Sequence, residues 1–421
     1  MVVKRKVLII VENMPVPPDF RVWKEARSLR DAGYAVTVLC PRGKGCKQGY
    51  EYLEGIHIYR HPTSGDAKSP LGYLWEYGSA LCWEFVYSVW IFIRHGFDAI
   101  QGCNPPDNIF LVALPFKLFG VKYIFDHHDV IPELYFSKYE RKDFFYKLQV
   151  WLEAATFRFS NVVMSTNNSY RQIAITRGGV DPDKVFVVRN GPDPHTFKAV
   201  PPKPELKFGK RYLVGYVGNM DTQEGLDILI DVAQHVKQLG RNDVHFTCIG
   251  GGPGLSDLRQ MVVEKHVDDI VTFTGRIPYS DLLDILSTAD VCVNPDKPCP
   301  MNSMSTMIKI LEYMALAKPI VQFEGTEGRF SAQGASLYSD GHDRVADFAA
   351  KILWLLERPE ERTRMGEFGR KRIETELAWE YSVRNLLRAY EKAFSKSNNR
   401  QPLAVDDRTD GGRAKSIAGS R

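Results

Sequence analysis

The chain has 421 residues, 44% hydrophobic and 25% charged, which is the composition of a soluble globular protein with room for two domains. The formal net charge is +4, and the polar stretch after Phe394 supplies +3 of it, from six basic and three acidic residues. The nearly neutral remainder argues against a protein that binds duplex nucleic acid, because such proteins usually carry a basic face.

The seven cysteines are irregularly spaced and form no C-x-x-C motif. This pattern predicts reduced cytoplasmic thiols and no zinc site. The N-terminus, MVVKRKVLIIVENM, contains an apolar run of only about five residues, which is too short for a signal peptide. We therefore expect the run to form a first strand and the protein to be cytoplasmic.

The first half of the chain alternates strands with helices. A strand at 7–11 is followed by a helix at 21–32, which ends before Gly33, and by a strand at 35–39. Further short apolar strands are predicted at 99–101, 122–125, 161–165 and 185–188. Such alternation indicates a parallel sheet with helices on both faces.

Residues 73–93, YLWEYGSALCWEFVYSVWIFI, are nearly long enough to span a membrane. Glu76 and Glu84 lie inside the segment, and both would be costly in lipid. We favour a long helix buried against the sheet. A helix that also touches a membrane surface, at the inner face of the cell membrane, remains the alternative.

Residues 190–211 are rich in proline and charge and read as a domain linker. After it the alternation restarts, with strands expected at 212–217, 244–249, 270–274, 290–294 and 319–323. The sequence therefore predicts an α/β protein with two doubly wound parallel-sheet domains that face a cleft. We place the domains at 1–193 and 194–377, a last helix at 378–394, and a disordered tail at 395–421.

Two glycine loops mark the second domain. VGYVGNM ends its first strand at Gly218, and IGGGPG follows the next strand at Gly250 and Gly251. A third loop carries Ser305 and Thr306 before a helix predicted at 307–317. A single glycine loop is more often a tight turn, but three helix N-termini together favour a phosphate or nucleotide site.

In the first domain, a strand ends in Asp126-His127-His128-Asp129, where a cleft is expected. No further His or Cys motif supports zinc, so a hydrogen-bonding or acid–base role is favoured. The loop QGCNPPDN, with Asn104 and Asp107, and the helix start at Arg21 are expected at the same rim.

The helix after Thr306 carries Lys309 and Glu312, which are three residues apart and share a face. Alone, this pair is as consistent with a surface ion pair as with a ligand site.

The ordered set of motifs resembles family 4 of the retaining nucleotide-sugar glycosyltransferases, which have the GT-B fold. The resemblance covers about residues 1–394 and is carried by Arg21, Glu25-Ala26, Leu29, Gly33, His128-Asp129, Asn190-Gly191-Pro192-Asp193, Gly218, Gly250 to Pro253, Gly275-Arg276, Ala289-Asp290-Val291, Leu311 to Ala315 and Lys318-Pro319. Each piece is weak alone, and their order and spacing are specific.

The resemblance implies an acceptor-side first domain, a second domain that binds a nucleoside diphosphate sugar, and a final helix that crosses back to the first domain. It implies that Glu312 holds the donor ribose and that His128 contacts the sugar near the reaction centre. No cofactor is implied, since the nucleotide sugar is a substrate.

Three positions depart from the family pattern. Met304 stands where a first glutamate is usual, and Asn219 and Glu224 replace two cations that usually bind the diphosphate. A leaving diphosphate needs positive charge or amide donors. We expect Lys309 to supply the charge without a metal, with Arg276 and Arg329 as rivals.

The residues expected at the site form three groups. The catalytic group is His128, Lys309 and Glu312. The donor-binding group is Gly218, Asn219, Gly250, Gly251, Arg276, Ser305, Thr306, Lys309 and Glu312. The acceptor-side group is Arg21, Asn104, Asp107, His127 and Asp129.

Two functions from different classes compete. The favoured one is transfer of a sugar, with retention, to a glycan or lipid-linked glycan. The alternative is a non-catalytic relative that binds a nucleotide sugar or glycan as a partner subunit, and the three departures favour it. An epimerase or phosphorylase is less favoured, because no extra acid–base carboxylates or cofactor lysine are recognisable.

Overall fold

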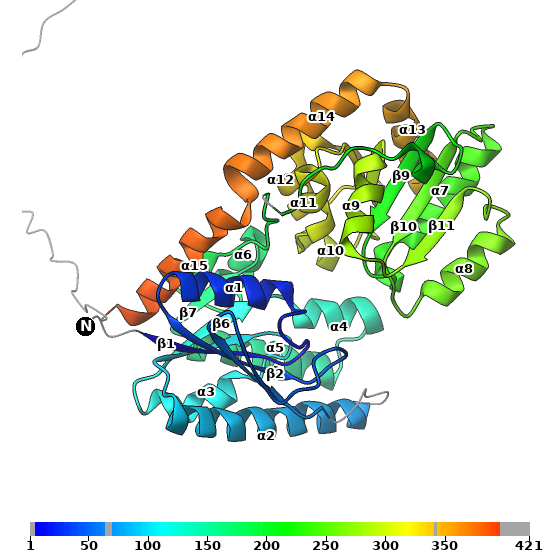
Figure 1. Cartoon of the computed structure of the whole chain (residues 1–421). Coiled ribbons are helices and arrows are strands. Elements are labelled where there is room, and N and C mark those ends of the chain that lie inside the picture. The colour runs from blue at the N-terminus through cyan, green and yellow to red at the C-terminus, as the bar shows by residue number, and fades with distance from the viewer. Residues whose placement is uncertain (1–4, 64–69, 195, 341–342, 396–421) are drawn as a thin grey trace, which may run out of the picture.

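The computed structural model describes residues 5–63, 70–194, 196–340 and 343–395. It contains one largely parallel and one fully parallel sheet, each covered by helices on both faces, and the chain crosses from the first to the second and back (Figure 1). The predicted GT-B architecture of two doubly wound domains is confirmed. The predicted tail, apart from Ser395, lies outside the described residues.

The first sheet has eight strands in the order β3-β4-β2-β1-β5-β6-β7-β8, all parallel except β3, which is antiparallel to β4. The strands are β1 (Lys6–Val11), β2 (Ala35–Pro41), β3 (Tyr50–Leu53), β4 (Ile56–His61), β5 (Ala99–Cys103), β6 (Lys122–His127), β7 (Val162–Ser165) and β8 (Val185–Val187). The sequence did not predict β3 and β4. β3 is a short edge strand with no buried residue, so its sequence has no core-facing pattern.

Helices cover both faces of this sheet. On one face α1 (Phe20–Asp31) packs through Val22, Ala26 and Leu29, which are spaced for one buried stripe. Asp19 caps α1 by accepting a hydrogen bond from the Val22 amide. The other face is covered by α2 (Pro70–Arg94), α3 (Phe110–Lys117), α5 (Phe144–Phe159) and α6 (Asn168–Thr176), and α4 (Ile131–Tyr139) follows β6.

The second sheet is parallel throughout, in the order β11-β10-β9-β12-β13-β14. Its strands are β9 (Tyr212–Val217), β10 (Val244–Ile249), β11 (Val271–Gly275), β12 (Val291–Asn294), β13 (Ile320–Phe323) and β14 (Ser336–Ser339). Its helices are α7 (Leu226–Gln238), α8 (Leu255–Glu264), α9 (Tyr279–Thr288), α10 (Pro300–Met304), α11 (Ile308–Ala315), α12 (Thr326–Ala332) and α13 (Arg344–Leu356). β1 and β9 lie inside their sheets, so the loops that follow them open at the carboxyl edge where such folds bind ligands.

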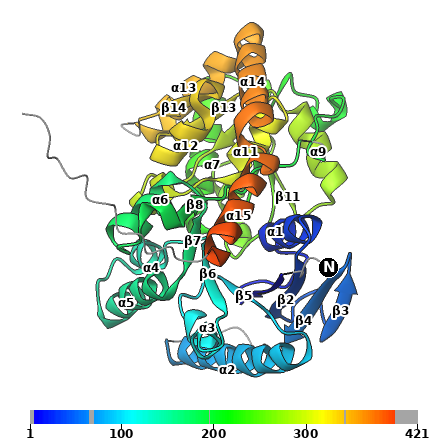
Figure 2. The same ribbon diagram turned by 90° about the vertical axis from the view of Figure 1, so that its left-hand side faces the viewer.

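The chain returns to the first domain at its end. α14 (Pro359–Arg372) lies on the second domain, and α15 (Trp379–Phe394) crosses the first (Figure 2). Leu386, Ala389 and Tyr390 of α15 are buried in the same core as α1. Trp379 donates a hydrogen bond to Ser28 Oγ at 3.0 Å. The last helix therefore fastens the second domain to the first.

Candidate active site

The two glycine loops of the second domain lie against each other. Gly250 has a φ of 131°, and a Cβ there would lie 1.9 Å from the carbonyl oxygen of Gly218. A Cβ on Gly251 would lie 3.4 Å from Cγ of Arg276, and one on Gly252 would lie 2.8 Å from Oδ1 of Asn219. Gly218, Asn219, Gly250, Gly251 and Arg276 therefore come together beyond the carboxyl ends of β9, β10 and β11, as expected.

Tyr313 fixes α11 beside these loops. Its hydroxyl accepts a hydrogen bond from the Val217 amide at 2.9 Å and donates one to the Val293 carbonyl at 3.2 Å. The neighbouring residue Glu312 is half-buried, and burial raises its pKa to about 7 although Lys24 and Lys309 lower it. Lys24 belongs to α1, so Glu312 lies where the two domains meet.

Lys309 is not free to carry the diphosphate charge. It is 8% exposed, its Nζ lies 2.8 Å from Asp296 Oδ1, and it also pairs with Glu224. Burial lowers the pKa of Lys309, but the carboxylates of Asp296 and Glu224 outweigh burial and raise it. This geometry does not support a diphosphate-binding role for Lys309, which stays a prediction, and the buried amine does not form the alternative surface pair with Glu312.

Arg276 and Arg329, the two alternatives to Lys309 as the diphosphate-binding cation, differ in whether their charge is already paired. Arg329 donates to Glu324 Oε1 at 2.7 Å and lies over the ring of Tyr338. Arg276 is exposed, lies beside Gly251, and makes no ion pair or hydrogen bond with any residue that the structure describes. Arg276 is thus the cation at the glycine loops whose charge is not already engaged.

Ser305 and Thr306 lie between two helices rather than at the start of one, because the chain forms α10 and then α11. The Ser305 hydroxyl is 2.9 Å from the hydroxyl of Tyr170, and Arg189 donates to Thr306 at 3.2 Å. Both partners belong to the first domain. The two hydroxyls therefore join the domains in the donor-free chain, and their expected donor-binding role stays a prediction. Ser305 also lines a cavity of about 310 Å³ beside α10.

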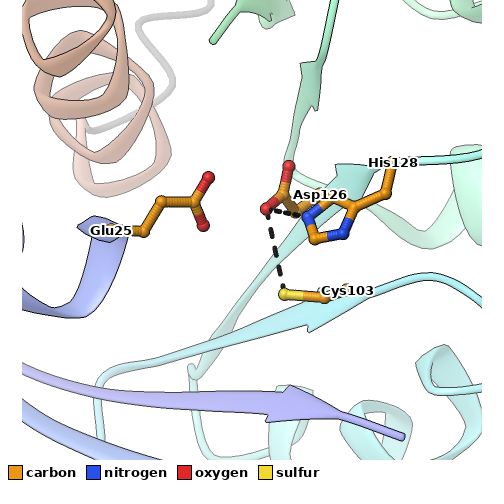
Figure 3. Close-up of side chains that lie close together, drawn as sticks. All are labelled: Glu25, Cys103, Asp126 and His128. Carbon is orange, nitrogen blue, oxygen red and sulfur yellow. Dashed lines mark hydrogen bonds and ion pairs between the residues drawn. The ribbon is translucent and has the colours of Figure 1, made fainter. Parts of the chain in front are cut away.

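In the first domain, Asp126 is the centre of a buried polar group (Figure 3). Its Oδ2 lies 2.6 Å from Nε2 of His128, and Arg21 donates to its Oδ1 at 2.7 Å. Burial alone would raise the pKa of Asp126, but Arg21 and His128 outweigh it and hold this pKa below its usual range. His128 therefore has an ionised carboxylate that orients its ring.

The expected acceptor-side residues are mostly scaffold. Asn104 is fully buried and accepts hydrogen bonds from the amides of His128, at 2.6 Å, and Asp129, at 3.2 Å, while it donates to Asp107. His127 is fully buried between aromatic rings, and burial lowers its pKa to about 3, so it stays neutral.

The burial of Arg21, Asn104, Asp107 and His127 contradicts an acceptor-binding role for all four, because each is at most 6% exposed. Only His128 and Asp129, which are half-buried, can still meet a substrate from this loop.

Within the part of the chain that the structure describes, two groups of side chains have the spacing of a metal site. Glu25, Cys103, Asp126 and His128 offer ligand atoms within 4.8 Å of one another. Arg21 lies 3.1 Å from Glu25 and 2.7 Å from Asp126, so a guanidinium already supplies the charge that a metal ion would bring. These residues therefore do not favour a metal.

The second group is Glu12, His61 and Glu84, also in the first domain. Burial and the charge of Glu12 raise the pKa of Glu84 well above its usual value, which favours a neutral carboxyl group over a metal-binding carboxylate. Neither group lies at the glycine loops, where a metal would have to meet a diphosphate.

Sequence reasoning missed Glu25, Gln101 and Lys24 as parts of the site. Glu25 had a signal, since it lies four residues after Arg21 on one helix face. Gln101 also had one, as the polar residue within an apolar strand. Lys24 had none, because its approach to Glu312 depends on how the two domains meet.

Comparison with known proteins agrees with the two-domain fold. Residues 19–191 match the family model described as "Glycosyl transferase 4-like domain", and residues 211–358 match "Glycosyl transferases group 1". Alpha-maltose-1-phosphate synthase of Mycolicibacterium smegmatis is 25% identical over 296 residues, 65% of this chain and 74% of that protein. A GDP-mannose-dependent monoacylated alpha-(1-6)-phosphatidylinositol monomannoside mannosyltransferase of Corynebacterium glutamicum is 27% identical over 194 residues, 43% of this chain and 49% of its own.

Solved structures show the same fold. Sucrose-phosphate synthase of Thermosynechococcus elongatus has a TM-score of 0.73 at 17% identity and covers 93% of this chain and 99% of its own. Anabaena HepE, solved in complex with UDP-glucose, has a TM-score of 0.69 at 15% identity and covers 92% and 99%. The two matched regions coincide with the two sheets, and the chain therefore belongs to the family 4 glycosyltransferases, which use nucleotide sugars and have the GT-B fold.

Proposed function

We propose that this glycosyltransferase moves a sugar from a nucleoside diphosphate to a glycan or lipid-linked glycan, with retention and without a metal. The observation that carries the proposal is the placement of Glu312. This half-buried carboxylate, in the family's ribose-binding position, lies beside Lys24 of the first domain and one residue from Tyr313, which is anchored to the glycine-loop strand.

The donor fits the carboxyl edge of the second sheet. Gly218, Gly250 and Gly251 are half-buried at this edge, where their backbone would meet a diphosphate. The exposed Arg276 beside them would neutralise the charge that develops as the diphosphate leaves. Glu312 would accept hydrogen bonds from the ribose hydroxyls. Names of relatives that specify GDP-mannose and a complex with UDP-glucose support this class of donor.

On the facing domain, His128 would meet the sugar. Asp126 accepts a hydrogen bond from its Nε2, which fixes the orientation of the ring. Retention is inferred from the family resemblance. Metal independence is inferred from Arg276, which supplies a cation at the glycine loops, and from Arg21, which compensates the carboxylates of the first domain.

The test begins with a thermal-shift screen of nucleotide sugars, since a bound donor raises the melting temperature. The donor that binds is then incubated with glycan and lipid-linked acceptors in EDTA, and the anomeric configuration of the product is read by NMR. We expect a retained anomer in EDTA. Activity that returns only with Mn²⁺ or Mg²⁺ overturns metal independence, and an inverted anomer overturns retention.

Donor binding without product from any acceptor supports instead the non-catalytic relative. Glu312→Ala serves as the control for donor binding, because it removes only the proposed contact with the ribose. Its donor affinity should fall by roughly 1.5–3 kcal/mol.

A further inference from the structure

The helix α2 presents an apolar stripe to solvent. Trp75, Val86 and Ile93 are 73%, 55% and 80% exposed, and Trp83 and Trp90 on the same face are 41% and 45% exposed. At 100° per residue these five side chains fall within about 80° of one another. A helix of a free-standing soluble domain would carry polar residues there.

The opposite face of α2 is buried and partly polar. Ala80, Glu84, Ser88 and Ile91 lie against the first sheet and are at most 5% exposed. The polarity of α2 is thus the reverse of the expected one, with a carboxyl group inside and tryptophans outside. This corrects the prediction that the apolar residues of 73–93 are simply buried, and it indicates that the outer stripe has a partner.

The same layer of helices adds further apolar side chains. Leu118 and Phe119, just after α3, are 88% and 72% exposed, and Phe144 and Trp151 on α5 are 71% and 61% exposed. α2, α3 and α5 cover one face of the first sheet, on the side away from α1 and α15 (Figures 1 and 2). We call the outward sides of these three helices and residues 118–119 the outer face. Apolar patches of this extent mark interaction surfaces.

The charges of the outer face have one sign. The exposed charged side chains that the structure describes on the three helices are Arg94, Lys147 and Arg158, and Lys117 is half-buried. The acidic residues of these helices are covered: Glu84 and Glu153 are buried, and Glu76 is half-buried. Basic side chains among tryptophans match an anionic lipid surface, where tryptophan prefers the headgroup level.

We propose that the outer face rests on the surface of a bilayer that contains anionic lipid. None of the helices in the described ranges combines the length and apolar character needed to cross a bilayer. A second copy of the chain fits the face less well, because a two-fold contact would set the basic side chains against each other without acidic partners.

Docking in this way would place the expected acceptor side near lipid. A cavity of about 320 Å³ opens at the carboxyl ends of β1, β2 and β4, and Glu76, Ser79 and Ala80 of α2 form one wall of it. α2 thus reaches from the outer face to the edge of the sheet that faces the donor domain. A lipid-linked acceptor for this cavity rests on the proposed function, whereas the docking itself does not.

The test is co-sedimentation of the full chain with vesicles of phosphatidylcholine alone or mixed with phosphatidylglycerol. We expect binding to the mixed vesicles, weakening with salt, and a blue shift of tryptophan fluorescence. Trp75→Ser combined with Ile93→Ser should weaken binding about tenfold or more. The matched control is Trp354→Ser, a 38% exposed tryptophan on α13 of the other domain, which should bind as the unchanged protein does.

Three results overturn the proposal: no binding to either vesicle, equal loss in the double variant and the control, or a lipid-free dimer that the double variant abolishes. Donor binding by thermal shift is measured on the same samples. If the double variant still binds donor, its loss of vesicle binding is not a folding defect, and failure of the docking stays distinct from failure of the proposed transfer.

Discussion

Lys309 and Glu224, two residues that are unusual at their positions, form an ion pair with each other. A carboxylate stands at position 224, where the family has a cation, and it pairs with the lysine on α11. Asp296 pairs with the same amine at 2.8 Å, and the Tyr216 hydroxyl donates to Glu224 at 2.7 Å. The two unusual residues thus belong to one ionic group. They are 85 residues apart in sequence, so the sequence around either one does not reveal its partner.

Lys309→Met should therefore act on stability. Removing the amine leaves two carboxylates without a counter-ion in a largely buried site, which typically costs about 3–5 kcal/mol. Arg276→Met should act on ligand affinity, because this exposed side chain has no described partner to lose. The measurements are chemical denaturation and calorimetric titration with a nucleoside diphosphate.

We expect Lys309→Met to lower the free energy of unfolding. We expect Arg276→Met to weaken binding of the nucleoside diphosphate but not binding of the uncharged nucleoside. The opposite result would restore Lys309 as the phosphate ligand: Lys309→Met would be stable but would no longer bind the diphosphate, and Arg276→Met would still bind it.

Glu312 predicts a pH dependence of donor binding. Its pKa, raised to about 7 by burial, means that the carboxylate is only partly ionised near neutral pH. The ionised form accepts the ribose hydroxyls better, so donor affinity should rise between pH 6 and pH 8. Glu312→Gln should bind more weakly at pH 8 and should show a flatter profile, by titration at each pH. An equally steep profile in the variant would assign the dependence to another group.

The same group has the opposite effect on folding of the free protein. Its pKa is about 7 in the folded chain and 4.5 as the reference value, so its stabilising contribution is complete below pH 4.5 and is lost as pH rises through 7. Melting temperatures of the donor-free protein, compared with Glu312→Gln across this range, would show that loss.

At the scale of elements, α15 is linked to the loop of His128 through three buried side chains. The hydroxyl of Tyr390 donates to Gln101 Oε1 at 2.6 Å, and Gln101 Nε2 donates to Asp126 at 3.1 Å. Asp126 in turn holds His128. Because the amide of Gln101 is fixed at both ends, the crossing helix helps to orient the histidine.

Tyr390→Phe tests this relay by removing one hydroxyl. It leaves the Gln101 oxygen unpaired, so the amide is held only through Nε2, by Glu25 at 2.6 Å and Asp126 at 3.1 Å. With this looser hold on Asp126, kcat should fall about tenfold while KM for the donor stays constant. Tyr34→Phe is the matched control, because the ring of Tyr34 packs 5.4 Å from that of Tyr390 and its hydroxyl has no hydrogen bond among the described residues. The pH profile of kcat should change only in the first variant, and identical profiles would reduce Tyr390 to a packing role.

The elements themselves were largely predictable. The strands at 212–217 and 244–249 agree with β9 and β10 to the residue, because apolar runs bounded by glycine or charge have one reading in a parallel sheet. The break between α10 and α11 was not predictable, since Ser305 and Thr306 look like helix caps and in fact bind the other domain. Tertiary contacts there outweigh the local signal.

At the scale of the whole molecule, the order of the two domains along the chain could be predicted from the sequence, whereas the contact between them could not. The composition of residues 190–211 predicted a linker between two sheets, and the second sheet begins at Tyr212. The contact itself depends on pairs such as Asn167 with the Met304 carbonyl, 137 residues apart. No pattern along the sequence marks such pairs, and they decide which candidate residues face a substrate.

Glu327 is the charged centre of that contact. This buried carboxylate of α12 accepts hydrogen bonds from the amide and hydroxyl of Ser169, at 2.9 and 2.8 Å, and from Arg189, at 3.2 Å. Arg189 is itself only 8% exposed and lies over the ring of Phe330. The carboxylate therefore compensates a buried guanidinium and ties the second domain to the first.

Glu327→Ala should loosen the two domains. Arg189 would be left buried without its counter-ion, a loss that typically costs about 3–5 kcal/mol and that is relieved if the domains separate and water reaches the guanidinium. We expect a larger radius of gyration in X-ray scattering and two thermal transitions in calorimetry instead of one. The control is Glu324→Ala, a nearby carboxylate whose pair with Arg329 is about half exposed and contributes little. Unchanged scattering in Glu327→Ala, with a single transition at the original temperature, would mean that the other contacts, such as α15 on the first sheet and Asn167 with the Met304 carbonyl, hold the domains together without Glu327.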